Sequence, residues 1–223
     1  MSPASVTAVL VHSPYLGPAT LRPLADALTA LGHPPVLLDL LPSVAEAPVH
    51  QRLVGAFADA VSDAEVRGPL ALVGHGGAGP LLPAFADELE ELDISALVYL
   101  DAELPTPGRS VRELDPARYA AAARAGGRWG EPLAAMVEDP VLRAEITAEL
   151  PEVPLAYLKE ARPTVPWTGP TGYVALSDGQ ALLAARAAGW PAWDLGAHHL
   201  ACATGPEPVA HAVLGVLAQL RAG

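Results

Sequence analysis

Short apolar runs alternate with segments of helical length along most of the chain. The runs carry no polar alternation, as expected for parallel strands that are buried on both faces. Glycine and proline mark the ends of the intervening helices, as Gly32 and Pro34 do after the first one. The strand-like runs are 6–11, 36–40, 70–73, 94–100, 172–176 and 190–195; the helical segments are 21–31, 50–67, a helix opened by the glycine cluster and running to about 92, 179–188 and 206–220. This order predicts an α/β fold, a mostly parallel sheet flanked by helices and joined by right-handed crossovers.

The alternation stops between the fourth and fifth strands. Residues 103–167 are rich in Ala, Arg and Pro, with helical stretches near 112–125, 131–138 and 139–150 and no convincing strand. We therefore expect a single domain over 1–223 with an α-helical cap inserted at about 103–167. The aromatic residues of this segment either form the core of the cap or line an apolar pocket between cap and sheet; they are Tyr119, Trp129, Tyr157 and Trp167.

Charge and cysteine content exclude several function classes. There are 13 Lys and Arg against 25 Asp and Glu, a net charge of −12, and Lys159 is the single lysine. A nucleic-acid binder needs clustered cations, so we expect no nucleic-acid partner. Cys202, the only cysteine, allows neither an internal disulfide nor a thiol zinc site, and we expect no cofactor and no metal. Low charge also suggests a small-molecule substrate without strong anionic groups.

The sequence shows neither a pattern typical of a leader segment nor an apolar run long enough to span a membrane, and both bear on the cellular compartment. Residues 1–5 show no basic or cleavable apolar segment, and every apolar run is short, which predicts a cytoplasmic protein with no membrane span. The sequence is compatible with a homodimer.

A glycine cluster follows the third strand and has two interpretations. Read literally, Gly74-His75-Gly76-Gly77-Ala78-Gly79 is G-x-G-x-x-G between a strand and a helix, with Asp101 ending the next strand. That is the dinucleotide-binding pattern, and it would make the chain an NAD(P)-dependent oxidoreductase. However, this pattern normally occupies the first strand-to-helix turn, and here two such units precede it.

The second interpretation is a nucleophile elbow with glycine at the nucleophile position. In an elbow, a strand ending in Gly-His turns sharply at a serine, and here Gly76 takes the place of that serine. Glycine accepts the positive φ of the elbow but supplies no attacking atom. Either the substitution was introduced, or the natural protein lost the serine. Asp101 and Asp178 follow strand ends after the elbow, and His199 follows the last strand, in the order elbow, acid, histidine.

These segments, taken in order, resemble a known family. Nearly the whole chain is similar to a small α/β-hydrolase of the actinobacterial type, and the resemblance rests on 11–14, 73–75, 100–101, 154–157, 172–177 and 189–191. It implies an ester, lactone or amide hydrolase with Gly76 in place of the nucleophile and His199 as base. Asp178 or Asp101 would orient the histidine, and both alternatives remain open.

The same resemblance suggests which residues surround the substrate. The N–H groups of Gly77 and of the residues following His12 would hold a developing oxyanion. The candidate substrate-binding or oxyanion residues are His12, Ser13, Tyr15, His75 and Gly77. His75 is expected mainly to pack beside the turn, and His198 to be a neighbour of the site.

Three functions are compatible with this pattern. The first is an enzyme of secondary metabolism that uses a His–Asp dyad on a small apolar molecule, by water-mediated hydrolysis, cyclisation, elimination or rearrangement without a covalent intermediate. The second is a catalytically inactive binding protein on the same fold. The third is the NAD(P)-dependent oxidoreductase.

Overall fold

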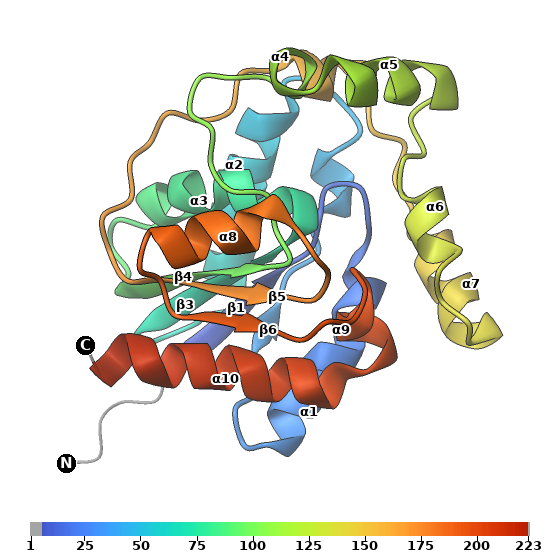
Figure 1. The fold of residues 1–223 in the computed structure, drawn as a ribbon. Coiled ribbons are helices and arrows are strands. Elements are labelled where there is room, and N and C mark those ends of the chain that lie inside the picture. The colour runs from blue at the N-terminus through green and yellow to red at the C-terminus, as the bar shows by residue number, and fades with distance from the viewer. Residues whose placement is uncertain (1–5, 223) are drawn as a thin grey trace.

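The protein is built on one six-stranded, fully parallel sheet (Figure 1). A computed structural model describes residues 6–222, so residues 1–5, on which the expectation about the N-terminus rests, lie outside the described part. The strand order is β2-β1-β3-β4-β5-β6. The strands are β1 Thr7–Val11, β2 Val36–Leu37, β3 Leu70–His75, β4 Ile94–Leu100, β5 Thr171–Ala175 and β6 Ala192–Asp194. The predicted α/β fold with a parallel sheet is confirmed.

Helices cover both faces of the sheet (Figure 1). One face carries α1 (Arg22–Ala30) and α10 (Pro206–Ala222); the other carries α2 (Val49–Asp63), α3 (Leu82–Glu88) and α8 (Gln180–Ala187). Along β1 the side chains alternate between two hydrophobic clusters: Val9 and Val11 pack with α2 and α3, while Ala8 and Leu10 pack with α1 and α10. Burial on both faces explains why the strand sequences show no polar alternation.

The segment between β4 and β5 is helical, as expected of a cap. Its helices are α4 (Val111–Leu114), α5 (Pro116–Ala125), α6 (Glu131–Ala134) and α7 (Pro140–Ala148). Side chains cap three of them: Ser110 forms a capping box with Glu113, and Asp115 and Asp139 accept hydrogen bonds from the first turns of α5 and α7. In Figure 1, α4 and α5 lie beyond one face of the sheet, and α6 and α7 hang beside its carboxyl edge.

Several elements are shorter than the sequence predicts. The single helix expected from the glycine cluster to about residue 92 is instead a 3-10 segment, η3 (Gly76–Leu81), followed by α3, which ends at Glu88. Pro80 and Pro83 lack the N–H that a continuous helix needs. The helix expected over 50–67 ends at Asp63, and the strand expected over 36–40 pairs only at Val36–Leu37.

The loops also contain three short 3-10 helices. They are η1 (Pro18–Thr20), η2 (Leu41–Ser43) and η4 (Leu155–Lys159); in addition, the short helix α9 (Ala201–Thr204) precedes α10. Within residues 6–222, no helix is both long and apolar enough to cross a bilayer.

Candidate active site

The turn after β3 brings the backbone of Gly76 directly under the ring of His199. Gly76 has φ +55°, a left-handed conformation that strains any residue with a Cβ. A Cβ placed on Gly76 would lie 3.0 Å from Nε2 of His199 and 3.5 Å from Cβ of Ser13. The sharp turn predicted at this position is therefore present, and the space its side chain would enter is bounded by His199 and Ser13.

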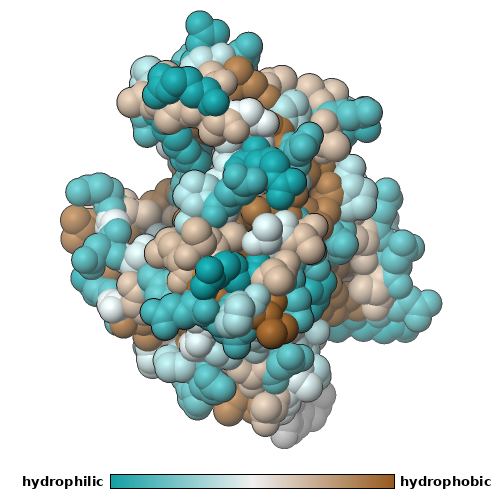
Figure 2. Space-filling model, turned by 90° about the vertical axis from the view of Figure 1, so that its right-hand side faces the viewer, coloured by the Kyte–Doolittle hydropathy of each residue, from teal (hydrophilic) through white to brown (hydrophobic). Residues whose placement is uncertain are grey.

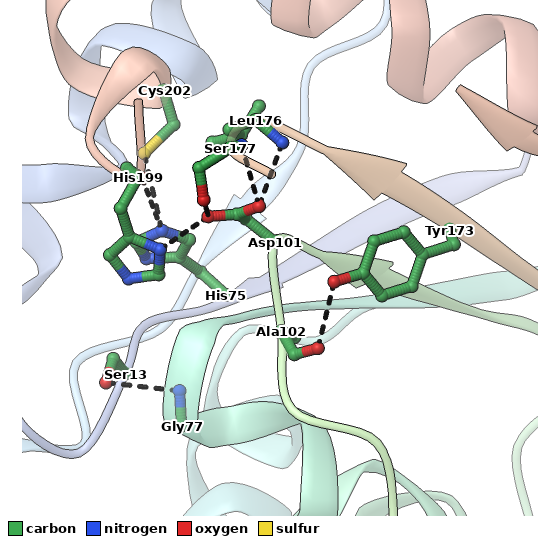
Figure 3. A network of polar contacts seen from close by, with 10 residues as sticks. All are labelled: Ser13, His75, Gly77, Asp101, Ala102, Tyr173, Leu176, Ser177, His199 and Cys202. Carbon is green, nitrogen blue, oxygen red and sulfur yellow. Dashed lines mark hydrogen bonds and ion pairs between the residues drawn. The ribbon is translucent and has the colours of Figure 1, made fainter. Parts of the chain in front are cut away.

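His199 is paired with Asp101. Its Nδ1 donates to Oδ2 of Asp101 at 2.7 Å (Figure 3). Because an ionised carboxylate only accepts hydrogen bonds, Nδ1 carries the ring proton in neutral His199 and Nε2 is left as an acceptor. The His199 side chain is 21% exposed and that of Asp101 7%. The pair thus presents a basic nitrogen toward Gly76 from a largely buried support.

Asp101 is held at the carboxyl edge of the sheet by the end of β5. It adopts φ +45°, and its Oδ1 accepts the N–H groups of Leu176 and Ser177 at 3.0 and 2.9 Å, while its Oδ2 accepts the Ser177 hydroxyl at 2.8 Å. Burial raises the pKa of Asp101, but the hydrogen bonds from His199 and Ser177 outweigh it and lower the pKa to about 2. Asp101 is consequently ionised at neutral pH and can stabilise a protonated His199.

Asp178, the other candidate partner of the histidine, is not part of this arrangement. It is exposed on the loop between β5 and α8, and His199 bonds to Asp101 instead. The left-handed backbone at Asp101 places its carboxylate at the end of β5. There it binds Ser177, the residue just before Asp178. Sequence order alone does not distinguish the two carboxylates; the bonds from Ser177 hold Asp101 beside His199.

His75 packs against the ring of His199 and binds its backbone. The two rings stack with centroids 4.4 Å apart, and Nε2 of His75 donates to the carbonyl oxygen of His199 at 3.0 Å (Figure 3). His75 is fully buried, and its Nδ1 has no partner among the described residues. Burial, with a further contribution from the nearby His199, lowers the pKa of His75 to about 3. A neutral, fully buried ring therefore packs against His199 and binds its carbonyl oxygen.

His12 lies beneath the site, but both of its ring nitrogens are engaged by backbone. Nδ1 donates to the carbonyl oxygen of Ser13 and Nε2 accepts the N–H of Leu40, each at 3.0 Å. The ring is 2% exposed, and burial lowers its pKa. Its side chain therefore joins the loop after β1 to the loop after β2, and neither ring nitrogen is free to bind a substrate.

Ser13 occupies the place where the N–H groups of the loop were expected to act. Its Oγ accepts the N–H of Tyr15 at 3.3 Å and that of Gly77 at 3.4 Å (Figure 3). Pro14 has no N–H, so neither of the two residues after Ser13 offers a free backbone donor. The Ser13 hydroxyl, 3.4 Å from the Gly77 nitrogen, is a side-chain donor that this loop presents beside the turn.

The remaining glycines of the cluster allow close packing of backbone. All six residues of η3 are buried. A Cβ on Gly77 would lie 2.9 Å from Cε2 of Tyr15, and one on Gly79 would overlap the carbonyl oxygen of Glu103. Asp101 is also committed to His199 and Ser177 rather than free for a ribose hydroxyl. The arrangement favours the elbow interpretation of the cluster over the dinucleotide-binding one.

A cavity of about 480 Å³ lies between Tyr15 and the cap. Its apolar wall comes from α5, from the segment around Trp129 and Leu133, and from Leu158 of η4. Figure 2 views the side from which α6 and α7 project and shows hydrophobic residues in small patches between hydrophilic ones.

Comparison with known proteins identifies the fold. No protein-family model and no curated protein sequence matches the chain. Among solved structures, an extracellular α/β-hydrolase from a Paenibacillus species superposes with TM-score 0.75 at 18% identity, over 95% of this chain and 98% of that one. A thermophilic esterase from Thermogutta terrifontis gives 0.68 at 17% identity, over 96% and 90%. Tomato methylketone synthase I, solved as a variant with β-ketoheptanoate, gives 0.66 at 15% identity, over 97% and 99%.

The chain therefore has the α/β-hydrolase fold. Its structural neighbours are hydrolases, esterases and a methylketone synthase that bind or act on small molecules.

Proposed function

We propose that this protein is an enzyme in which His199, oriented by Asp101, transfers a proton on a small apolar carbonyl compound without forming a covalent acyl-enzyme. The observation that carries the proposal is the pairing of a free His199 Nε2 with a bare backbone at Gly76, where a Cβ would be only 3.0 Å away. This is a general base and its orienting carboxylate at an elbow that has no nucleophile.

The first reaction that this arrangement supports is ester or lactone hydrolysis by water. His199 Nε2 takes a proton from a water molecule while the water oxygen bonds to the carbonyl carbon of the substrate. Charge then develops on the carbonyl oxygen, where the Ser13 hydroxyl can donate a hydrogen bond. When the carbon–oxygen bond breaks, protonated His199 returns the proton to the departing alcohol.

A second reaction, decarboxylation of a β-keto acid, is favoured by the structural likeness to the methylketone synthase solved with β-ketoheptanoate. This reaction needs no nucleophile. The bond to the carboxylate breaks, carbon dioxide leaves, and the electron pair forms an enolate whose oxygen the Ser13 hydroxyl can stabilise. His199 Nε2, which had first taken the proton of the substrate's carboxylic acid, then delivers that proton to carbon, giving a methyl ketone.

The test compares three proteins on p-nitrophenyl esters and on β-keto acids: wild type, His199→Ala and His198→Ala. The matched control is His198, the residue just before His199, whose Nε2 lies 3.0 Å from the Thr204 hydroxyl. Loss of a general acid–base should lower kcat about 100-fold or more in His199→Ala and leave His198→Ala near wild type. Turnover that survives His199→Ala would contradict the proposal. Ligand binding with no turnover of either substrate class would assign the chain instead as a binding protein.

Gly76→Ser tests the elbow separately. Because a Cβ there is 3.0 Å from Nε2, His199 must shift by a few tenths of an ångström to accept the serine. We expect esterase activity that a serine-directed fluorophosphonate blocks, whereas wild-type turnover should resist that reagent. A correctly folded variant that never reacts with the fluorophosphonate would argue against an elbow at this position.

A further inference from the structure

Tyr15 contacts the turn at Gly76–Gly77 and also lines a cavity. One edge of its ring lies against the backbone of the η3 turn, where a Cβ on Gly77 would be 2.9 Å from Cε2 of Tyr15. The same side chain lines the 480 Å³ cavity under the cap. Tyr15 is 9% exposed, so its neighbours cover most of its surface. The ring therefore touches both the turn that carries Gly76 and the cavity under the cap.

Groups from the cap hold this ring in place. Trp129 and Tyr157 meet it edge-on, with centroids 5.8 and 5.6 Å away. The guanidinium of Arg118 lies over it at 5.5 Å from the centroid. Arg118 is in turn fixed by a 2.7 Å ion pair with Glu103, two residues beyond Asp101. The position of the ring is thus tied both to the cap and to the loop that carries the carboxylate of the site.

The cavity behind Tyr15 suits a hydrocarbon chain. Three alanines of α5 and the side chains of Trp129, Leu133 and Leu158 give it an apolar lining. The charged groups at its margin are already paired: Arg118 with Glu103, and Arg128 with Glu131 at 2.7 Å. No unpaired charge among these lining residues is left to attract a polar ligand, and burial of methylene groups is the interaction that such walls reward.

We propose that Tyr15 is the specificity-determining residue for substrate chain length, because its ring closes the passage between the reacting centre and the cap cavity. The inference rests on the proposed function for the location of the reacting centre. With Tyr15 in place, a chain ends at the ring; with a small side chain at this position, the site and the cavity become one continuous space.

The test measures binding of a homologous series of straight-chain methyl ketones by calorimetry. In wild type and in Tyr15→Phe, which keeps the ring, affinity should stop rising once the ketone's hydrocarbon chain is long enough to reach the ring of residue 15. Tyr15→Ala should continue to gain about fourfold per added methylene, the value of burying one such group. Refilling the cavity in the double variant Tyr15→Ala/Ala122→Leu should remove that gain, because Ala122 lines the cavity.

A truncated aromatic side chain in the core can destabilise a protein, so each variant is first checked by thermal unfolding, and Tyr15→Leu provides a milder truncation. The same chain-length dependence in wild type, Tyr15→Phe and folded truncation variants would overturn the inference, as would failure of every ketone to bind.

Binding does not require turnover, which separates the two proposals. An extended chain-length range in Tyr15→Ala, with no reaction of any ester or β-keto acid, supports the partition and refutes the enzymatic function. Turnover that depends on His199, together with an unchanged chain-length profile in Tyr15→Ala, supports the enzymatic function and refutes the role of Tyr15.

Discussion

Burial of His75 should make the stability of this protein fall steeply as the solution becomes mildly acidic. In the folded state the pKa of His75 is lowered from 6.5 to about 3, because the ring is fully buried and stacked on His199. The unfolded chain binds a proton at this histidine below pH 6.5, whereas the folded protein does so only near pH 3. Protonation therefore favours the unfolded state, and stability is lost as the pH falls through this interval.

The magnitude follows from the linkage between proton binding and folding. Each pH unit below the unfolded pKa corresponds to about 1.4 kcal/mol for one group, so His75 alone should cost about 2 kcal/mol by pH 5. The charged or titratable groups near it are His199, Asp101, His12 and the Cys202 thiol, and none of them is altered in the comparison below.

The perturbation is His75→Gln, whose amide can still donate to the carbonyl oxygen of His199 but does not titrate. Urea unfolding at pH 7 and pH 5 gives the free energy of unfolding for wild type, His75→Gln and the exposed control His33→Gln. Between the two pH values, wild type and His33→Gln should lose about 2 kcal/mol more than His75→Gln. Equal losses in wild type and His75→Gln would refute the reasoning, because the burial of a neutral His75 would then have no thermodynamic consequence.

Three further outcomes follow from the structure. Gly76→Ala places a Cβ at φ +55° and 3.0 Å from His199, and should lower the free energy of unfolding in urea by about 1 to 2 kcal/mol. Asp101 has its pKa lowered from 3.8 to about 2, so its contribution is complete above pH 4 and lost as the pH falls toward 2; circular dichroism should show an acid transition in wild type that is diminished in Asp101→Asn. Phe57→Ala removes a buried ring stacked on Phe85 at 4.3 Å and should cost about 3 to 5 kcal/mol, against little change for Leu183→Ala on the exposed side of α8.

The architecture was predictable because the strands have a physical signature in the sequence. Runs such as Ile94–Leu100 are mostly apolar on both faces, and such runs, when they alternate with helical segments, are typical of a parallel sheet covered by helices on both sides. Helix bounds were less accurate where prolines lie inside an apolar pattern: periodicity through Pro80 and Pro83 suggested one helix, but the missing N–H groups divide it.

At the site, sequence order placed Gly76 and His199 at the same edge of the sheet but did not select the carboxylate. Asp101 and Asp178 both follow strand ends, and the difference between them lies in a left-handed backbone and a hydrogen bond from Ser177, neither of which leaves a pattern in the sequence. The role of His12 was likewise hidden, because its partner is a backbone N–H 28 residues away at Leu40.

The bonds that Asp101 makes have a consequence for comparing this protein with its relatives. Its carboxylate joins the ends of β4 and β5 through Leu176 and Ser177 as well as holding His199. A descendant that abandoned chemistry would still be selected to keep Asp101, because losing it would loosen the sheet edge. Among the described residues, the His199 ring makes a single hydrogen bond, to Asp101, so selection for stability would hold this position less strongly. An aspartate retained at this position is thus uninformative about the proposed activity, and a histidine retained at position 199 is the feature that the proposed function requires of an active relative.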